Sequence, residues 1–255
     1  MKNVWILATN SWRENLRSRY YLMTAVFGVV LIYVSLLLGV LAADQEIRVL
    51  LDFGLGAIEL MGLVAAVYGA CTIILREMET KTIYLILTRP VGRGEYLMGR
   101  FLGLMLSVAV SIALMACVHL SILFLKGWTW TSVYVLALFG TCLKVLICAA
   151  LALFVALFST SVPTALIIAG ILWSLGHFLP EIRHLIAASP SRAMTPLKVL
   201  SYIIPDLGLY NARDRISRLP LSPGEAPLWA WLGYAALYAG GWLALARLWL
   251  RKKEF

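Results

Sequence analysis

Charge is scarce in this chain of 255 residues. Asp, Glu, Lys and Arg make up only 14% of it, whereas a soluble domain has about 25% charged residues. Hydrophobic residues make up 62%, compared with about 45–50% in a soluble domain. Residues 20–43, 101–125, 145–180 and 226–246 carry no charge at all, and each run is long enough for the roughly 20 residues that cross a bilayer as a helix. The composition excludes an ordinary soluble domain and predicts an all-α membrane protein with several spans.

Motifs of catalysis and metal binding are also missing. The chain has no GxxxxGK[ST] loop for nucleotide phosphates, no HExxH for zinc and no GxSxG nucleophile elbow. Its cysteines and histidines show no CxxC or Cys/His ligand spacing, so we expect them to be packing residues. They are Cys71, Cys117, Cys142, Cys148, His119, His177 and His184. We therefore expect no catalytic residue, no metal site and no cofactor bound by this chain.

The hydrophobic pattern predicts one transmembrane domain over residues 1–255. Residues 1–19 form an amphipathic pattern with an apolar face, which predicts a helix lying at the membrane interface. Between the fourth and fifth apolar segments, Ser159 and Ser161 precede Pro163, which is typical of a new helix start. The apolar face of residues 1–19 consists of Val4, Trp5, Ala8, Trp12 and Leu16. The predicted spans are residues 20–43, 53–75, 98–125, 131–158, 162–179 and 228–248.

Basic residues indicate the orientation. The net charge of +9 comes largely from the ends of apolar segments, so we expect no nucleic acid partner. Six spans put both termini on one side, and the two short loops opposite carry only Arg48 and Lys126. The positive-inside rule then predicts cytoplasmic termini in the inner membrane. The basic residues on the side of the termini are Lys2, Arg13, Arg17, Arg19, Arg76, Lys81, Arg89, Arg93, Arg100, Arg247, Arg251, Lys252 and Lys253.

The segment 180–227 is predicted to be external, with short apolar helices that dip into the bilayer or lie on it. Thr195 and Pro196 start one such helix and Pro205 ends it. Two ionisable residues fall within spans, where charge is costly and marks functional candidates. Lys144 and Glu59 could pair, line a translocation path or reach water.

The loop between the second and third spans has a distinctive pattern. Within residues 76–100, the acids Glu77 and Glu79 precede an apolar set at Ile83, Ile86 and Leu87, and residues 88–90 end the helix. Such a short amphipathic helix has too little apolar area to fold alone. We therefore expect a partner surface for the coupling loop, residues 76–97; a solvated connection is the alternative.

This loop reads E-x-E-x-x-T-x-x-L-x-L-x-R-P-V-x-R-x-E-Y-x-x-G-R and closely resembles the cytoplasmic loop of type 2 ABC exporter permeases. The similarity is greatest to the branch that includes the membrane subunit of the nitrous-oxide-reductase copper maturation system. The six spans, the amino-terminal helix and IPDLGLYN at residues 204–211 extend the resemblance over nearly the whole chain. Lys81 is a departure, because many members have glycine there.

The resemblance implies a transporter subunit that dimerises with a second copy or a homologous permease. It also implies separate ATPase subunits, which bind the ATP and Mg, and an external accessory protein is a further partner class. Carried over by position, the ATPase-coupling residues are Glu77, Glu79, Thr82, Ile83, Ile86, Leu87, Arg89, Pro90 and Arg93. The alternatives are an intramembrane lipid-modifying enzyme using Glu59, Lys144 or His119, and an ATP-independent transporter.

Overall fold

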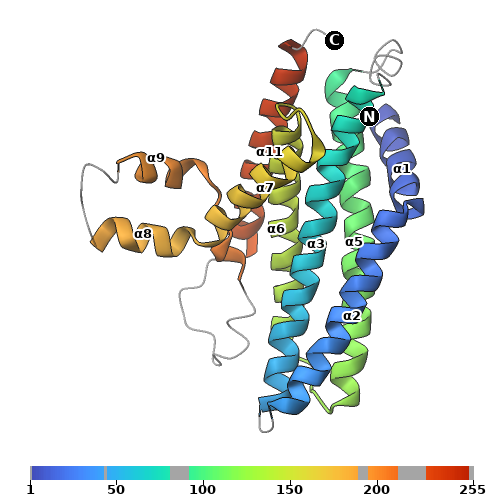
Figure 1. The fold of residues 1–255 in the computed structure, drawn as a ribbon, viewed down its shortest axis with the longest axis vertical. Helices are drawn as coiled ribbons and strands as arrows, with labels where there is room; N and C mark the ends of the chain where they lie inside the picture. The colour runs from blue at the N-terminus through green and yellow to red at the C-terminus, as the bar shows by residue number, and fades with distance from the viewer. Residues whose placement is uncertain (1, 43–44, 81–91, 189–194, 212–227, 253–255) are drawn as a thin grey trace.

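The computed structural model describes residues 2–42, 45–80, 92–188, 195–211 and 228–252. Every regular element within these residues is helical, and they include no strand. The longest helices run side by side along the long axis of the molecule (Figure 1). They are α2 (Arg19–Leu41), α3 (Glu46–Glu79), α5 (Arg93–Leu125), α6 (Ser132–Ala156) and α11 (Leu228–Lys252).

Four of the described helices, α2, α3, α5 and α6, are long and apolar enough to cross a membrane. The bent pair α7 (Val162–His177) and α8 (Leu179–Ala188) passes the same test as one span broken by 59°, which raises the number to five. At 25 residues α11 is as long as α6, but its tryptophans, tyrosines and glycines make it less apolar. The predicted all-helical, multispan fold is confirmed; the count of six crossings stays a prediction.

The break between α6 and α7 lies where the serines and the proline predicted it. Ser161 caps α7, and its hydroxyl accepts a hydrogen bond from the backbone amide of Thr164 at 3.4 Å. Pro163 occupies the first turn, where its missing N–H leaves no donor unpaired. Polar caps therefore divide an apolar run that is too long for one crossing.

Two helices are much longer than the predicted spans. α3 has 34 residues and α5 has 33, or about 50 Å at 1.5 Å per residue, whereas the hydrocarbon core is about 30 Å thick. The end of α3, the start of α5, the start of α1 and the end of α11 lie at the same end of the bundle (Figure 1). We call residues 72–80 and 92–100, which lie at this end, the stalk.

Helix α6 lies at the centre of the bundle and α2 at its edge. Of the most apolar window of each helix, 78% is buried in α6 but only 28% in α2. In α6 the buried face includes many alanines, and such small residues let neighbouring helices approach closely. Large apolar side chains of α2, such as Leu22, Phe27 and Leu37, are exposed and would face lipid.

The amino-terminal helix α1 (Lys2–Arg17) packs directly on the beginning of α5. A Cβ atom on Gly103 would lie 2.6 Å from the carbonyl oxygen of Ala8, so only glycine permits this backbone approach. The side chains of Ala8, Ser11 and Asn15 are buried, whereas Trp5 is 62% exposed. The helix is confirmed, but its packed face is the small polar one, and the predicted apolar face keeps Trp5 and Leu16 exposed.

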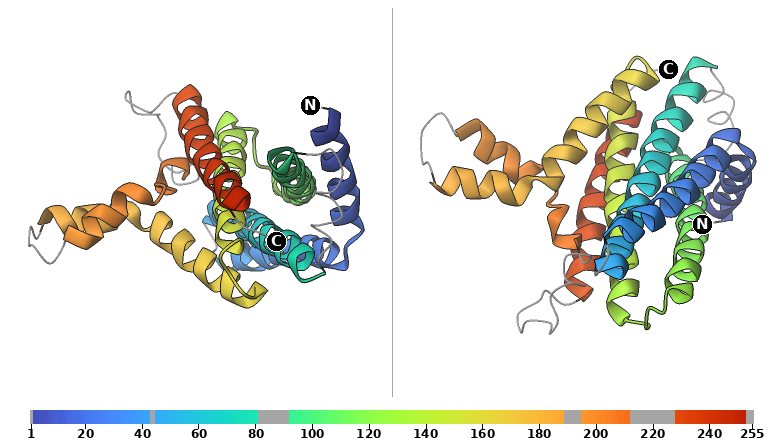
Figure 2. Two further views of the ribbon diagram at one scale, coloured as in Figure 1. Left: turned by 90° about the horizontal axis from the view of Figure 1, so that it is seen from above. Right: turned by 60° about the horizontal axis from the view of Figure 1, so that its bottom comes forward.

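Helices α8 and α9 (Thr195–Ile203) leave the bundle and project sideways from it (Figures 1 and 2). The helix predicted from Thr195 and Pro205 is confirmed, since α9 ends at Ile203. The chain then returns to the bundle through a short 3-10 turn, η3 (Gly208–Tyr210).

Candidate functional site

Most of the predicted coupling residues lie outside the described residues. These are Thr82, Ile83, Ile86, Leu87, Arg89 and Pro90. The structure does place Glu77, Glu79 and Arg93, which flank them on the stalk. Glu77 and Glu79 belong to the last turn of α3, and Thr80 is its C-cap.

Arg100 joins three helices at the base of the stalk. Its guanidinium forms ion pairs with Glu77 of α3 and, at 2.8 Å, with Glu14 of α1. Glu77 is only 8% exposed, whereas Glu79 is exposed. Glu77 therefore lies against Arg100, and of the two predicted acids Glu79 has its side chain at the surface. Sequence reasoning missed the partners Arg100 and Glu14 because no local pattern relates residues so far apart.

Arg93 joins the stalk to the last helix. Its Nη1 donates a hydrogen bond of 2.7 Å to the carbonyl oxygen of Leu250, in the last turn of α11. A basic group at a helix C-terminus is favourable because unpaired carbonyls and the helix dipole make that end negative. At the same place Glu95 accepts a hydrogen bond from the amide of Gly92 at 3.3 Å, which caps α5.

The charged residues predicted within spans lie next to one another. Nζ of Lys144 on α6 is 2.8 Å from Oε1 of Glu59 on α3. Lys144 is fully buried and Glu59 is 8% exposed. Of the three interpretations that the sequence left open, the structure therefore shows pairing.

His119 is a buried packing residue with two partners. Its Nδ1 lies 3.0 Å from the hydroxyl of Tyr134, and its Nε2 lies 3.2 Å from the carbonyl oxygen of Leu50. The cysteines are free thiols at scattered positions, from buried Cys71 and Cys148 to exposed Cys117. Within the described parts of the chain, no three His, Cys, Asp or Glu residues gather in a way that could hold a metal ion.

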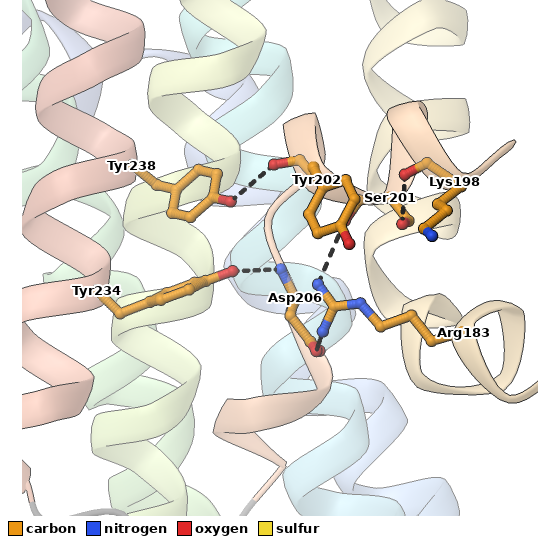
Figure 3. Close-up of polar contacts among 7 residues, drawn as sticks. All are labelled: Arg183, Lys198, Ser201, Tyr202, Asp206, Tyr234 and Tyr238. Atoms are coloured by element: carbon orange, nitrogen blue, oxygen red, sulfur yellow. Dashed lines mark hydrogen bonds and ion pairs between the residues drawn. The ribbon is translucent and has the colours of Figure 1, made fainter. Parts of the chain in front are cut away.

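A polar cluster holds α8 and α9 to the bundle (Figure 3). Arg183 of α8 donates to Oδ2 of Asp206 at 2.8 Å and to the carbonyl oxygen of Ser201 at 3.2 Å. The amide of Asp206 donates to the hydroxyl of Tyr234 on α11 at 2.7 Å, and Tyr238 donates to the carbonyl of Tyr202 at 3.4 Å. Burial raises the pKa of Asp206, and the charge of Arg183 opposes that shift.

Residues 204–211 continue this cluster into the core, and we call them the clamp. The hydroxyl of Tyr210 donates to the carbonyl oxygen of Trp231 on α11 at 3.0 Å. The backbone amide of Leu207 donates to the carbonyl oxygen of Gly176 on α7. A Cβ on Gly140 of α6 would lie 2.5 Å from the carbonyl oxygen of Tyr210. The clamp thus contacts α6, α7 and α11. The sequence analysis singled out these residues only for their resemblance and predicted none of these contacts.

Long apolar helices packed into one bundle define this protein as a multi-pass membrane protein. More specifically, the chain belongs to the ABC-2 family of transporter proteins, whose family model matches residues 5–219. It is 33% identical over 132 residues to the probable ABC transporter permease protein NosY of Stutzerimonas stutzeri. That match covers 48% of this chain and 46% of the relative, so the chain matches about half the length of this curated protein.

Family membership confirms the resemblance that the loop and residues 204–211 indicated. It also favours transport over the alternative of an intramembrane enzyme, because the family is one of transporter permeases. The three residues that such an enzyme would use, Glu59, Lys144 and His119, are buried and bonded to partners within the bundle.

Proposed function

We propose that this protein is the permease subunit of an ATP-driven exporter, coupled to separate ATPase subunits through residues 76–97. The stalk is the observation that carries the proposal. Because α3 and α5 exceed the bilayer thickness by about 20 Å in all, both helices extend past the hydrocarbon region, and their ends next to the loop carry the charged residues within 76–79 and 93–100. An apolar face at Ile83, Ile86 and Leu87 needs a protein surface there, since lipid cannot cover it.

The stalk also offers a route by which movement of the loop reaches the membrane helices. Arg100 pairs with acids of α3 and α1, and Arg93 bonds to the end of α11. A force on residues 81–91 would therefore act on α1, α3, α5 and α11 together. Motion of such a packed group as a unit is the usual form of a transporter transition.

The proposal includes six crossings, cytoplasmic termini in the inner membrane and assembly with a second permease copy. In this reading α7 is the fifth crossing and α11 the sixth. One copy is a small bundle with α6 packed at its centre, so a path between two copies accommodates substrate more easily than a path through one. Glu59 and Lys144 pair with each other, and we propose that they stabilise the interior of the bundle and do not line the translocation path.

The test changes the apolar face of the loop. Replacing Ile83 and Leu87 with Asp puts two charges into the proposed contact, and desolvating charged groups costs several kcal/mol. We expect the variant to insert normally but to retain at least tenfold less ATPase subunit on co-purification, with stimulated ATP hydrolysis lost. The purified chain alone should hydrolyse no ATP.

A matched control places the same charges at the other end of the bundle. Leu41 is 81% exposed and Ile47 is 37% exposed, and the double variant Leu41→Asp/Ile47→Asp should assemble with the ATPase as the parent does. Full assembly and transport in the Ile83→Asp/Leu87→Asp variant would show that the loop is a solvated connection, and the coupling proposal would be wrong.

A further inference from the structure

A polar cavity of about 320 Å³ lies where α1, α2, α3 and α5 meet, at the base of the stalk. Its volume equals that of about ten waters in the liquid, which is room for a phosphate group and its glycerol. In Figure 1 the helices α2 and α3 meet at one end of the bundle and diverge toward this end. The side chains that line the cavity include Arg19, Arg76, Arg100, Glu14, Glu77, Asn15 and Thr72.

The charges of this cavity favour an anion. Its lining has three arginines against two glutamates, and both glutamates pair with Arg100. Among the described residues no acid pairs with Arg19 or Arg76, and both of these side chains are exposed. Two guanidinium groups therefore stand at the cavity without a described counterion, and guanidinium is well suited to bind phosphate.

Buried donors in the cavity wall also lack partners. The Nδ2 of Asn15 and the Nε of Arg100 are buried and make no hydrogen bond to a described residue. Asn15 is only 8% exposed, and a buried donor without a partner is unfavourable because it has lost its hydrogen bonds to water. An anionic oxygen in the cavity could satisfy such donors.

Apolar grooves flank the cavity on two sides. One, of about 240 Å³, runs along α3 and α7 and shares Tyr68 with the cavity. The other, of about 460 Å³, runs along α2 and α5 and shares Tyr21. From these tyrosines both grooves extend away from the stalk, toward Leu60 on α3 and Tyr33 on α2. The cavity and its two grooves therefore match the layout of a molecule with a polar head and two apolar tails that run into the bilayer.

We propose that this cavity binds the phosphate headgroup of an anionic phospholipid, with its acyl chains in the two flanking grooves. The lipid comes from the leaflet on the side of the termini, where basic pockets between membrane helices recognise anionic headgroups. The site lies at the junction of α1, α3 and α5 that Arg100 holds together. A bound lipid would therefore stabilise the base of the stalk, and this inference does not depend on which ATPase or substrate the protein uses.

The test compares lipid retention by the full-length chain in detergent, measured by native mass spectrometry in an equimolar mixture of dioleoyl phosphatidylglycerol and dioleoyl phosphatidylcholine. We expect phosphatidylglycerol to be retained in preference. The variant Arg19→Gln/Arg76→Gln should weaken that retention by about 30-fold, which corresponds to about 1 kcal/mol for each arginine. Retention of the two lipids in equal amounts by the parent would overturn the proposal.

The matched control removes the same charge outside the cavity. Arg13 and Arg17 are exposed on α1 and do not line the cavity, so Arg13→Gln/Arg17→Gln should change retention less than twofold. An equal loss in this control would mean a diffuse surface effect, and would overturn the proposal. So would displacement of the lipid by 10 mM inorganic phosphate, because the site would then take the free anion.

A second variant tests the acyl chains. A Cβ on Gly170 would meet open space, so Gly170→Leu fills the groove between α3 and α7 without disturbing a packed contact. We expect severalfold weaker retention of dioleoyl phosphatidylglycerol and unchanged binding of a short-chain dihexanoyl analogue. Unchanged retention of the long-chain lipid would overturn the assignment of that groove to an acyl chain.

Discussion

The ammonium group of Lys144 lies 2.8 Å from the carboxylate of Glu59, inside the contact between α6 and α3. Removing two charges from water is costly, and their attraction offsets that cost only when the geometry is close. A single acid and a single base in a mostly apolar contact fix how the two helices align, because any shift along the axis would separate them. The pair thus specifies packing more than it adds stability.

Replacing Lys144 with Met tests this relationship. The change leaves the Glu59 carboxylate buried without its partner, and breaking a buried pair in this way costs about 3–5 kcal/mol. We expect a lower unfolding midpoint in detergent. The double variant Lys144→Met/Glu59→Leu should lose less than Lys144→Met alone, since no charge remains buried. A double variant that loses as much as the two single changes together would contradict the pairing.

The contact between α1 and α5 can be tested at Gly103. Its Cβ would lie 2.6 Å from a backbone oxygen of Ala8, so Gly103→Ala should push α1 away and cost about 1–3 kcal/mol, as overpacking does. Gly170 offers the matched control, because a Cβ there meets open space. Gly170→Ala should be neutral or stabilise by up to about 1 kcal/mol. Thermal unfolding in detergent measures both, and equal effects would rule out the close contact.

The clamp depends on the hydroxyl of Tyr210. This hydroxyl donates to the Trp231 carbonyl at 3.0 Å in the core, so Tyr210→Phe should cost about 1 kcal/mol, the usual net value of a hydrogen bond. Tyr238 makes a longer bond of 3.4 Å at an exposed position. Tyr238→Phe should therefore change the unfolding midpoint little. A larger loss from Tyr238→Phe would mean that the outer contacts hold the segment.

The sequence predicted the helices well because apolar runs and caps are local signals. Predicted spans 20–43 and 131–158 correspond to α2 (Arg19–Leu41) and α6 (Ser132–Ala156). For α3 the prediction was residues 53–75, but the helix runs from Glu46 to Glu79. A stretch of high hydropathy ends at charged residues. The helix continues through Arg48, Asp52 and Arg76 because a charged side chain does not affect the backbone hydrogen bonds.

The contacts between helices were much less predictable. The amphipathic pattern of α1 predicted a helix at the membrane interface but not its contact with α5, where the backbone approaches Gly103 and Ala8, Ser11 and Asn15 are buried. In a membrane, large apolar side chains can face lipid at no cost, so helix contacts select small residues. The ion pairs of Arg100 and the clamp at Tyr210 join residues far apart in sequence, and such pairs carry no local signal.

The orientation can be checked by labelling. Gly92 is exposed on the stalk and Thr129 is exposed at the opposite end of α5. In a Cys117→Ala background, cysteines at these positions should react with an impermeant thiol reagent from opposite faces of the membrane, Gly92→Cys from the cytoplasm. This follows from the basic residues on the side of the termini. Labelling of both from one face would contradict the predicted topology.

The last prediction concerns Arg100, and its test distinguishes docking of the ATPase from transmission of the ATPase's movement. Replacing Arg100 with Gln leaves Glu77 buried without a counterion and releases α1 and α3 from α5. Residues 81–91 are unchanged, so the ATPase subunit should still co-purify. We expect substrate-stimulated ATP hydrolysis to fall severalfold, because movement of the loop no longer reaches all the helices of the stalk.

The companion variant Arg100→Gln/Glu77→Gln provides the control. Two amides can bond to each other without a buried charge, so part of the coupling should return in the double variant. Loss of ATPase assembly in Arg100→Gln, to the extent expected for Ile83→Asp/Leu87→Asp, would contradict the separation of the two roles. Arg100 would then belong to the docking surface itself, and its ion pairs with Glu77 and Glu14 would serve docking of the ATPase.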